Sequence, residues 1–367
     1  MNSFFRHILQ STVLLFMVCS CATSDVLPCA DLNSLEGKEC SVSVDDIYSS
    51  VEIIPMETSD SCLLSYPGVV AFDDNGFLVL DRGNVYRFDN KGRFVNRIGR
   101  LGHGYGEYVN ANSVNWDCKR KIVFVGTFAN EIYKYDFSGK FLGKFSVSGG
   151  DDALLTSGWC EALGLYVCEI RKYSQNGVEV LLTTWTQNGK KVGSYPVYKD
   201  DKTVDRNYTE TGSLRAVTDG VLFKLPFCNT VYKLTKEGLS ECFELDFGSH
   251  SMTRDLLEDR SKYERQKNKY VIRNWEMTGN NLYLQIVCDD GERDVLVRRL
   301  DMSVQHNQLY KYNDNSHHLK VKGLSDDATF WPDIAKGDKV VGLVRNKDKN
   351  ANPVLVVAKE KKVKSAK

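Results

Sequence analysis

The sequence predicts an all-β protein, a six-bladed β-propeller of four-stranded antiparallel blades. Three observations lead to this prediction: a motif that recurs about every fifty residues, short strand-like segments between the copies, and turn signals at regular spacing. A unit of four antiparallel strands every 40 to 50 residues is typical of a propeller blade.

The repeated motif contains a Tyr, a basic residue, an apolar residue and then a turn that a Gly closes. Copies occur at 84–92, 130–139 and 229–238, with a degenerate copy at 182–189 and weaker ones at 295–301 and 354–359. The equivalent positions are Tyr86, Tyr133, Thr183 and Tyr232, which are spaced by 47, 50 and 49 residues. The motif therefore repeats once per expected blade.

Short segments rich in β-branched and aromatic residues precede the motifs, and each follows a turn signal. They are 77–80, 122–125, 164–167, 221–223, 282–287 and 340–344. Each unit then consists of four strands, with tight turns after the first and third. The six units are 64–99, 109–147, 154–196, 213–248, 271–304 and 326–360.

One further strand and two insertions complete the propeller, which we expect to cover residues 46–360. The apolar segment 50–54 is expected to join the last blade, because a closed ring leaves no sheet edge exposed. The insertion 249–270, between blades four and five, is expected to form a short charged helix with Met252, Leu256 and Tyr263 near one face. The insertion 305–325 is a polar loop that contains His317 and His318, and 361–367 is a basic tail.

Residues 1–20 have the features of an export signal. Arg6 precedes an apolar run, 8–18, that is too short for an ordinary transmembrane helix, and no other stretch is expected to span a bilayer. The segment Val18-Cys19-Ser20-Cys21 resembles the lipobox of bacterial lipoproteins, which implies that Cys21 carries a lipid. The alternative is an ordinary signal peptide cleaved nearby. Residues 21–45 have few strand signals and are expected to be a tether.

The propeller region resembles the six-bladed β-propeller lipoproteins of Bacteroides-type bacteria, relatives in fold of NHL-repeat propellers. Segments 53–57, 85–99 and 102–108 carry the resemblance, which extends over about 45–360. The family typically has a Gly-Pro-Gly-Glu-Tyr-like run where this chain has Tyr105 in place of Pro. The resemblance implies the fold and a membrane-anchored, exported protein, with the outer membrane as the expected location. It implies no settled activity.

Composition excludes some classes of protein. The 367 residues include 48 basic and 48 acidic ones, so the formal net charge is zero and gives no reason to expect a nucleic-acid partner. Nine cysteines follow Cys21 and none forms a CxxC pair, which argues against a structural zinc site. Cys160 and Cys168 flank an expected tight turn, so they are either a disulfide or small buried hydrophobic residues.

The two faces of the ring are expected to differ. Connections after the first and third strands are tight turns, and they define the tight-turn face; connections after the second and fourth strands define the long-loop face. Long loops on a rigid scaffold often carry binding residues. We expect a ligand to meet Arg82, Arg100, His103, Glu107 and Tyr108. The alternative is that 97–108 is a linker in which Glu107 and Tyr108 fix neighbouring blades.

Motifs for catalysis are few. No GxSxG elbow or HExxH helix occurs. The acidic stretch 289–294 could hold Ca²⁺, although a solvated turn is the simpler interpretation. The five histidines beyond the signal could converge on a metal; they are His103, His250, His306, His317 and His318. We expect a non-enzymatic envelope lipoprotein that binds a protein, peptide or glycan. The alternative is a metal-assisted hydrolase, lactonase or lyase at the central channel.

Overall fold

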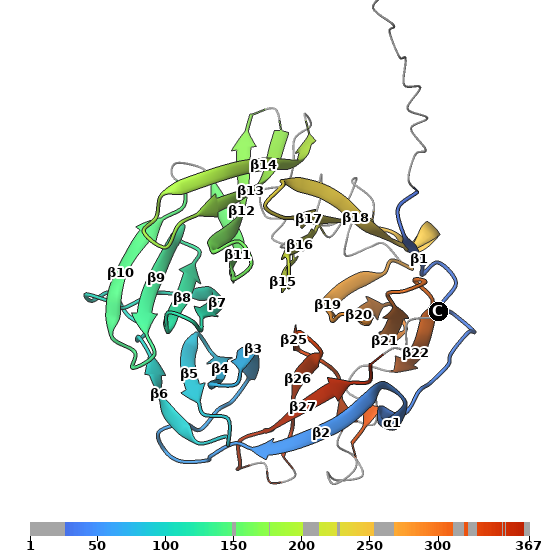
Figure 1. Ribbon diagram of the computed structural model, residues 1–367, viewed down its shortest axis with the longest axis horizontal. Coiled ribbons are helices and arrows are strands. Elements are labelled where there is room, and N and C mark those ends of the chain that lie inside the picture. The colour runs from blue at the N-terminus through green and yellow to red at the C-terminus, as the bar shows by residue number, and fades with distance from the viewer. Residues whose placement is uncertain are drawn as a thin grey trace, which may run out of the picture.

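Six four-stranded antiparallel sheets surround a central axis, as the sequence predicts (Figure 1). The computed structural model describes residues 26–148, 152–175, 177–200, 213–225, 228–252, 268–310, 319–321, 329–346, 348 and 350–362. From the inner to the outer strand, blade 1 is β3 (Pro67–Asp73), β4 (Gly76–Asp81), β5 (Asn84–Phe88) and β6 (Phe94–Ile98), and blade 2 is β7 (Ala111–Asp117), β8 (Ile122–Thr127), β9 (Glu131–Asp136) and β10 (Phe141–Ser146). Blade 3 is β11 (Ala153–Cys160), β12 (Leu165–Ser174), β13 (Gly177–Trp185) and β14 (Lys191–Asp200), and blade 4 is β15 (Ser213–Val217), β16 (Gly220–Lys224), β17 (Thr230–Leu234) and β18 (Leu239–Asp246). Blade 5 is β19 (Val271–Met277), β20 (Asn281–Cys288), β21 (Gly291–Arg298) and β22 (Val304–Tyr310), and blade 6 is β25 (Ile334–Lys336), β26 (Lys339–Val344), β27 (Val354–Glu360) and β2 (Tyr48–Pro55).

The sixth blade closes the ring in the expected way. Its outer strand, β2, comes from the N-terminal part of the chain and pairs antiparallel with β27, Ile53 opposite Val356. The repeated motif lies on the third strand of each of the first four blades, with Tyr86 on β5 and Tyr232 on β17. The period of about fifty residues is therefore the length of one blade.

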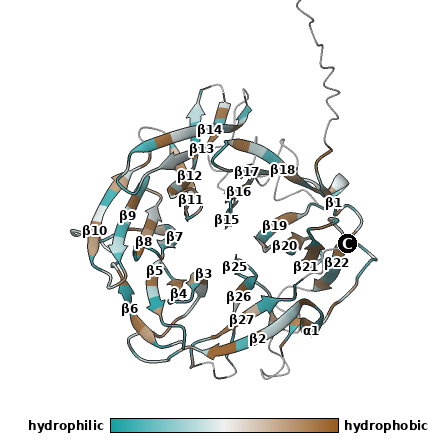
Figure 2. Ribbon diagram, viewed as in Figure 1, coloured by the Kyte–Doolittle hydropathy of each residue, from teal (hydrophilic) through white to brown (hydrophobic). Residues whose placement is uncertain are grey.

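Each pair of neighbouring blades shares one hydrophobic cluster. Successive residues of a strand point to opposite faces of its sheet, so Phe77 packs between blades 6 and 1 whereas Leu78 packs between blades 1 and 2. Both side chains are fully buried. Apolar segments consequently recur on the strands of every blade (Figure 2). A second strand buried on both faces appears in the sequence as a continuous apolar run.

Cys160 and Cys168 do not form a disulfide. Both are free and buried, and they lie in different hydrophobic clusters on opposite faces of blade 3. Cys160 packs toward blade 4 and Cys168 toward blade 2. The second of the two expectations, small buried hydrophobic residues, describes them.

The N-terminal segment differs from the expected tether. Of residues 21–45, those from 28 onward pack along the outer edges of blades 4 and 5, and we call residues 28–47 the strap. β1 (Cys29–Asp31) adds a parallel fifth strand to blade 4 beside β18. The strap buries Ala30, Leu32 and Leu35 in the core between blades 4 and 5. It ends in the short helix α1 (Val44–Ile47), which leads directly into β2.

Buried polar groups hold the strap in place. The guanidinium of Arg293, only 2% exposed, donates from Nη1 to the carbonyl of Leu35 and to Glu39. The amide of Asn307 also donates to Leu35, at 2.7 Å, and the backbones of Cys40 and Asn307 exchange two hydrogen bonds. These contacts join residues more than 250 positions apart in sequence, so local pattern could not reveal them.

The remaining elements are small. The 3-10 helix η1 (Gly248–His250) follows blade 4, and β23 (Leu319–Lys320) pairs with β24 (Thr329–Phe330) before blade 6. The expected helix in 249–270 falls largely on residues outside those described, as do residues 1–25 and therefore the export signal and Cys21. Within the described ranges, no helix is both long enough and apolar enough to cross a membrane.

Candidate functional site

The two faces of the ring carry connections of different length. The β3–β4 turn has only residues 74–75 and the β5–β6 turn residues 89–93, and both lie on the tight-turn face. The connections from one blade to the next lie on the long-loop face and are longer, such as 56–66 and 99–110. The expected asymmetry is present in these connections between blades, whereas most connections after the second strand, such as 82–83 and 128–130, are as short as the tight turns. The predicted residues gather on the long-loop face of blades 1 and 2.

The β6–β7 connection folds around the carboxylate of Glu107. Its Oε2 accepts a hydrogen bond from the Gly104 amide at 2.9 Å. The same oxygen would lie 2.0 Å from a Cβ placed on residue 102, where φ is +156°, so only Gly fits. Glu107 thus shapes the loop and still lines the cavity described below.

Tyr108 is part of the core between blades 1 and 2. Its side chain is 1% exposed, and its hydroxyl donates to the carbonyl of Ile98 at 3.3 Å. The ring meets Tyr133 and Tyr135 edge-on, with centroids 6.3 and 6.1 Å away. In this arrangement Tyr108 presents no face to a ligand, and its contacts match the linker interpretation of the loop.

The predicted cations lie at the surface. Arg82, Arg100 and His103 are all exposed. The guanidinium of Arg82 stands 5.1 Å from the centre of the Tyr66 ring, a cation–π contact between the β4–β5 turn and the β2–β3 connection. Tyr66 is itself positioned by Asp81, whose Oδ1 accepts the Tyr66 amide at 2.6 Å.

Apolar side chains that the prediction did not include gather around these cations. Among the described residues, eleven large apolar side chains are exposed, and six of them lie on the loops over blades 1 and 2: Leu63, Tyr66, Leu101, Tyr105, Val109 and Phe128. Tyr105 is 96% exposed and Tyr66 74%. Contiguous exposed apolar surface often marks an interaction site. We call these six residues, with Arg82, Arg100 and His103, the aromatic patch.

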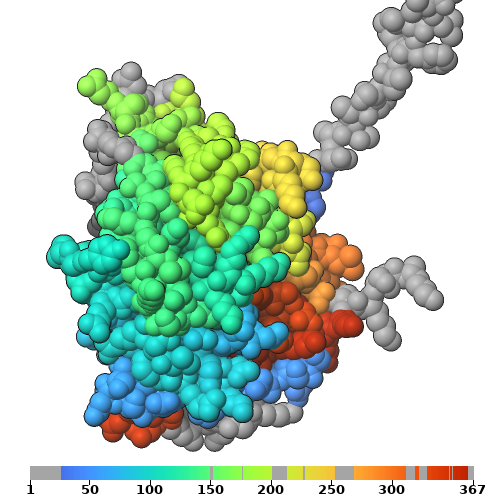
Figure 3. Space-filling model, turned by 60° about the vertical axis from the view of Figure 1, so that its left-hand side comes forward, coloured from blue at the N-terminus to red at the C-terminus, as the bar shows by residue number. Residues whose placement is uncertain are grey.

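A cavity of about 650 Å³ lies beside the patch. The β6–β7 connection forms one wall, through His103, Tyr105 and Glu107, and strands β9 and β10 of blade 2 form the other. Figure 3 shows the rim of the ring on this side, with the first three blades running from blue to green. A volume of this size accommodates a small ligand or one segment of a chain.

The blade 2 wall carries a closed charge network. Lys144 Nζ donates to Glu131 at 2.5 Å, and the Tyr133 hydroxyl donates to the other Glu131 oxygen at 2.9 Å. Although burial acts in the opposite direction, these two bonds lower the pKa of Glu131. The ring of Phe141 contacts Tyr105 edge-on at 5.3 Å. The cavity therefore combines aromatic surface with hydrogen-bonding groups of balanced charge.

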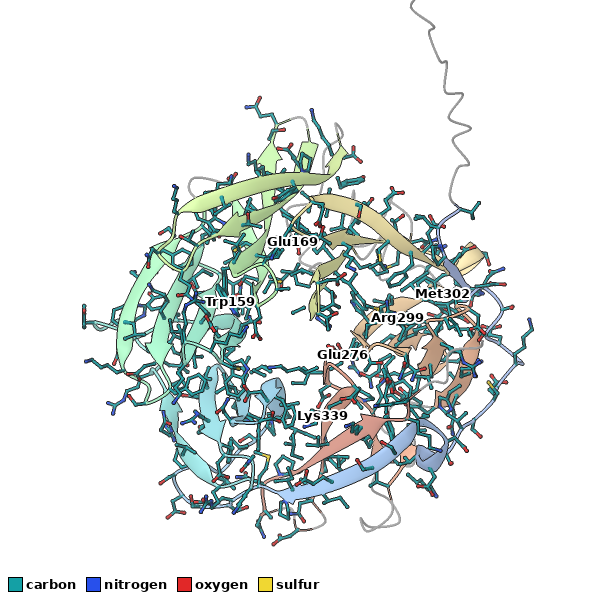
Figure 4. The ribbon with its side chains drawn as sticks, viewed as in Figure 1. Trp159, Glu169, Glu276, Arg299, Met302 and Lys339 are labelled. Atoms are coloured by element: carbon teal, nitrogen blue, oxygen red, sulfur yellow. The ribbon has the colours of Figure 1, made fainter. Side chains whose placement is uncertain are left out.

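The inner strands near the axis carry a second polar cluster. Arg215 Nε, on β15, lies 2.5 Å from Glu276 Oε1, on β19, and Glu276 Oε2 accepts the amide of Ala335 on β25 at 3.0 Å. Figure 4 shows Glu276 on the inner side of blade 5. Burial outweighs the attraction of Arg215 and raises the pKa of Glu276 to about 7. Three blades are joined by this contact.

The groups expected for catalysis or metal binding are dispersed. In 289–294, Asp289 and Asp290 form an exposed turn, whereas Glu292 pairs with Arg273 and Asp294 accepts a bond from Tyr310. His250 stacks on Tyr270 at 4.3 Å, and His306 is buried in blade 5. The described residues contain no group of three or more His, Cys, Asp or Glu side chains placed to hold a metal. His317 and His318 lie outside those residues.

The fold resembles that of a solved structure from Bacteroides. A protein of Bacteroides fragilis described as exported superposes with a TM-score of 0.65 and 17% identity, over 88% of this chain and 98% of that one. At this identity the likeness extends to the fold alone. A DUF4221 family member from Bacteroides vulgatus has a TM-score of 0.49 and 8% identity, over 86% and 99%. No curated protein matches the chain by sequence.

The family comparison covers almost the whole described structure. The matching family is characterised only as a domain of unknown function, DUF4934, and its match runs over residues 27–361. That range begins just before the strap and ends just after β27, so the match includes the strap as well as the six blades. The chain belongs to the DUF4934 family.

Proposed function

We propose that this protein is an exported, lipid-anchored binding protein that holds its ligand at the aromatic patch. One observation carries the proposal: six of the eleven exposed large apolar side chains of the described residues lie on the loops over blades 1 and 2, and two of them, Tyr105 and Val109, line the cavity. The export signal, the lipobox-like segment and the exported Bacteroides fragilis neighbour support the location. The protein needs no catalytic group for this function.

The composition of the patch favours an uncharged or zwitterionic ligand with apolar faces, such as a glycan or a peptide. Tyr66, Tyr105 and Phe128 offer rings for stacking. Arg82 and Arg100 offer donors at the rim, whereas Glu131 already has two partners in the cavity. The patch and the cavity have no large net charge that a ligand would have to neutralise.

The test is a comparison of matched variants in a ligand screen. Lipid-free protein is immobilised and exposed to a glycan array and to solubilised envelope proteins, and captured species are identified by mass spectrometry. The double variant Tyr105→Ala/Phe128→Ala is expected to lose the captured ligand. The control Leu300→Ala removes a side chain that is 70% exposed on the opposite face and is expected to retain it. Equal capture by all three proteins would contradict the proposal.

The lipid anchor is tested separately. Cells that produce the full chain are fed an alkyne-bearing fatty acid, and the protein is examined for label and for membrane fractionation. The wild type is expected to carry the label, and Cys21→Ser is expected to lose it and to leave the membrane, because stable anchoring depends on acyl chains. Label that persists in Cys21→Ser would place the lipid elsewhere.

A further inference from the structure

We propose that the tight-turn face docks on anionic phospholipid headgroups, so that the aromatic patch faces away from the membrane. The orientation rests on the proposed lipidation of Cys21, whereas the charged docking surface does not. Three features of the chain support the inference: the direction in which the strap enters the ring, the length of chain that precedes it, and the distribution of lysines between the two faces.

The strap enters from the tight-turn side. β1 pairs in parallel with β18, with Cys29 opposite Glu244 and Asp31 opposite Asp246. β18 follows the β17–β18 turn on the tight-turn face and runs toward the long-loop face. Residues that precede Cys29 therefore approach β1 from the direction of the tight-turn face.

The length of the preceding chain limits the height of the ring above the bilayer. Cys29 lies opposite Glu244, five residues along β18 from Leu239 at the tight-turn end, which corresponds to about 17 Å. The eight residues from Cys21 to Cys29 can span at most about 28 Å. A lipid on Cys21 would therefore hold the outer edge of blades 4 and 5, where β1 lies, within about 28 Å of the membrane.

Exposed lysines surround the tight-turn face. One or more stand on the turns of blades 1 to 4, and none has an ion pair among the described residues: Lys91, Lys121, Lys140, Lys190 and Lys236. β27 also ends on this face, where Lys361 and Lys362 are exposed. These two lysines therefore add to the basic residues of the turns.

The acidic side chains of this face are largely engaged. Four lysines pair with them across the turns: Lys339 with Asp74, Lys119 with Glu161, Lys233 with Asp219 and Lys359 with Asp338. Among the described residues of the connections and of the chain end at 361–362, basic residues outnumber acidic ones on the tight-turn face, whereas acidic residues outnumber basic ones on the long-loop face. An anionic membrane would attract the first face and repel the second.

The docking surface supplies a second attachment besides the acyl chains. A lysine close to an anionic bilayer contributes about 1 kcal/mol, which corresponds to about fivefold in partition. The attraction falls off within a Debye length, so it acts only while the turns lie close to the headgroups. With the strap along blades 4 and 5 and the turns against the lipid, the long-loop face of blades 1 and 2 faces the aqueous phase.

The test uses the mature chain with Cys21→Ser, so that no lipid is present, and co-sedimentation with vesicles. Protein is expected to bind vesicles that contain phosphatidylglycerol and not vesicles of phosphatidylcholine alone, and about 0.5 M salt is expected to release it. Lys140→Gln/Lys236→Gln is expected to weaken binding about 25-fold, at fivefold per lysine. The control Lys320→Gln/Arg345→Gln removes two exposed cations from the long-loop face and is expected to bind as the wild type does.

Equal binding to both vesicle types, or equal losses in both double variants, would overturn the docking surface. For orientation, vesicles carrying the lipidated protein are labelled with an acceptor dye at the headgroups. A donor dye at residue 140 is expected to be quenched more than one at residue 105, and the reverse would overturn the orientation. Binding to phosphatidylglycerol together with an unlabelled Cys21 would contradict the proposed anchor and leave the docking surface standing.

Discussion

Tyr105 and Tyr108 stand three residues apart in the same loop, and we expect their replacement by Ala to have opposite effects. The Tyr108 side chain is 1% exposed and packs against Tyr133 and Tyr135. Truncation of a buried aromatic ring costs about 3–5 kcal/mol, because the lost contacts leave a cavity. Tyr105 is 96% exposed, so Tyr105→Ala is expected to change the free energy of unfolding by no more than about 0.5 kcal/mol.

The hydroxyl of Tyr108 can be separated from its ring. Tyr108→Phe removes only the hydrogen bond to Ile98 and is expected to cost about 1 kcal/mol. The three variants are compared by urea unfolding of the lipid-free protein, followed by far-UV circular dichroism. Ligand capture is measured on the same samples. Tyr105→Ala is expected to lose ligand with stability intact, whereas Tyr108→Phe is expected to keep it.

Two results would refute this reasoning. If Tyr108→Ala unfolds at the same urea concentration as the wild type, the ring does not hold blades 1 and 2 together. If Tyr105→Ala is as destabilised as Tyr108→Ala, the Tyr105 ring has a structural role. The proposal that the aromatic patch binds a ligand would then lose its main argument.

Three further outcomes are expected. Arg293→Met removes the buried bonds to the Leu35 carbonyl and the Glu39 carboxylate, so amide exchange at residues 30–42 should accelerate by an amount that reflects about 1–3 kcal/mol, while exchange in blade 2 stays unchanged. An equal change of exchange in the strap and in blade 2 would contradict the role of Arg293. Gly99→Ala should destabilise by about 1–3 kcal/mol, because φ is +64° and a Cβ would lie 2.7 Å from the Tyr135 ring; a neutral effect in urea unfolding would show that the loop relaxes. Burial raises the pKa of Glu276 to about 7, so the folded state holds this proton more tightly than the unfolded state, and stability from this group is lost as the pH rises from about 4.5 to 7. Relative to Glu276→Gln, the free energy of unfolding of the wild type should therefore fall over that range. A difference in free energy of unfolding between the two proteins that does not change with pH would contradict the raised pKa of Glu276.

The architecture was predictable because each blade repeats the same local chemistry. Second strands buried on both faces produce apolar runs such as 77–80, and the tight turns that precede them need Gly or Asn and Asp at fixed positions. Closure by 50–54 was predictable for a related reason, since an open ring would leave two unpaired edges.

The strap could not be predicted from local pattern. Residues 28–40 alternate weakly and contain few β-branched residues. Their burial depends on Arg293 and Asn307, which the fold brings from blade 5. Of the two alternatives for Cys160 and Cys168, the structure shows the buried, unbonded cysteines, because the two side chains point to opposite faces of blade 3.

The candidate site was predictable only in part. Loop length and residue type indicated the region of Arg82, Arg100 and His103, which the structure places at the surface. Sequence could not separate Tyr105 from Tyr108, because both are aromatic residues in a glycine-rich loop and only the packing of blade 2 buries one of them. Tyr66 and Phe128 were missed because an apolar residue in a loop does not by itself indicate exposure.

Site-specific photo-crosslinking in the producing bacterium shows directly which face of the ring meets the ligand and which meets the membrane. A benzophenone amino acid is placed at position 105, on the aromatic patch, or at position 140, on the tight-turn face. We expect a ligand adduct from position 105, competed by added ligand, and phospholipid adducts from position 140. A competable ligand adduct from position 140, with none from position 105, would contradict it.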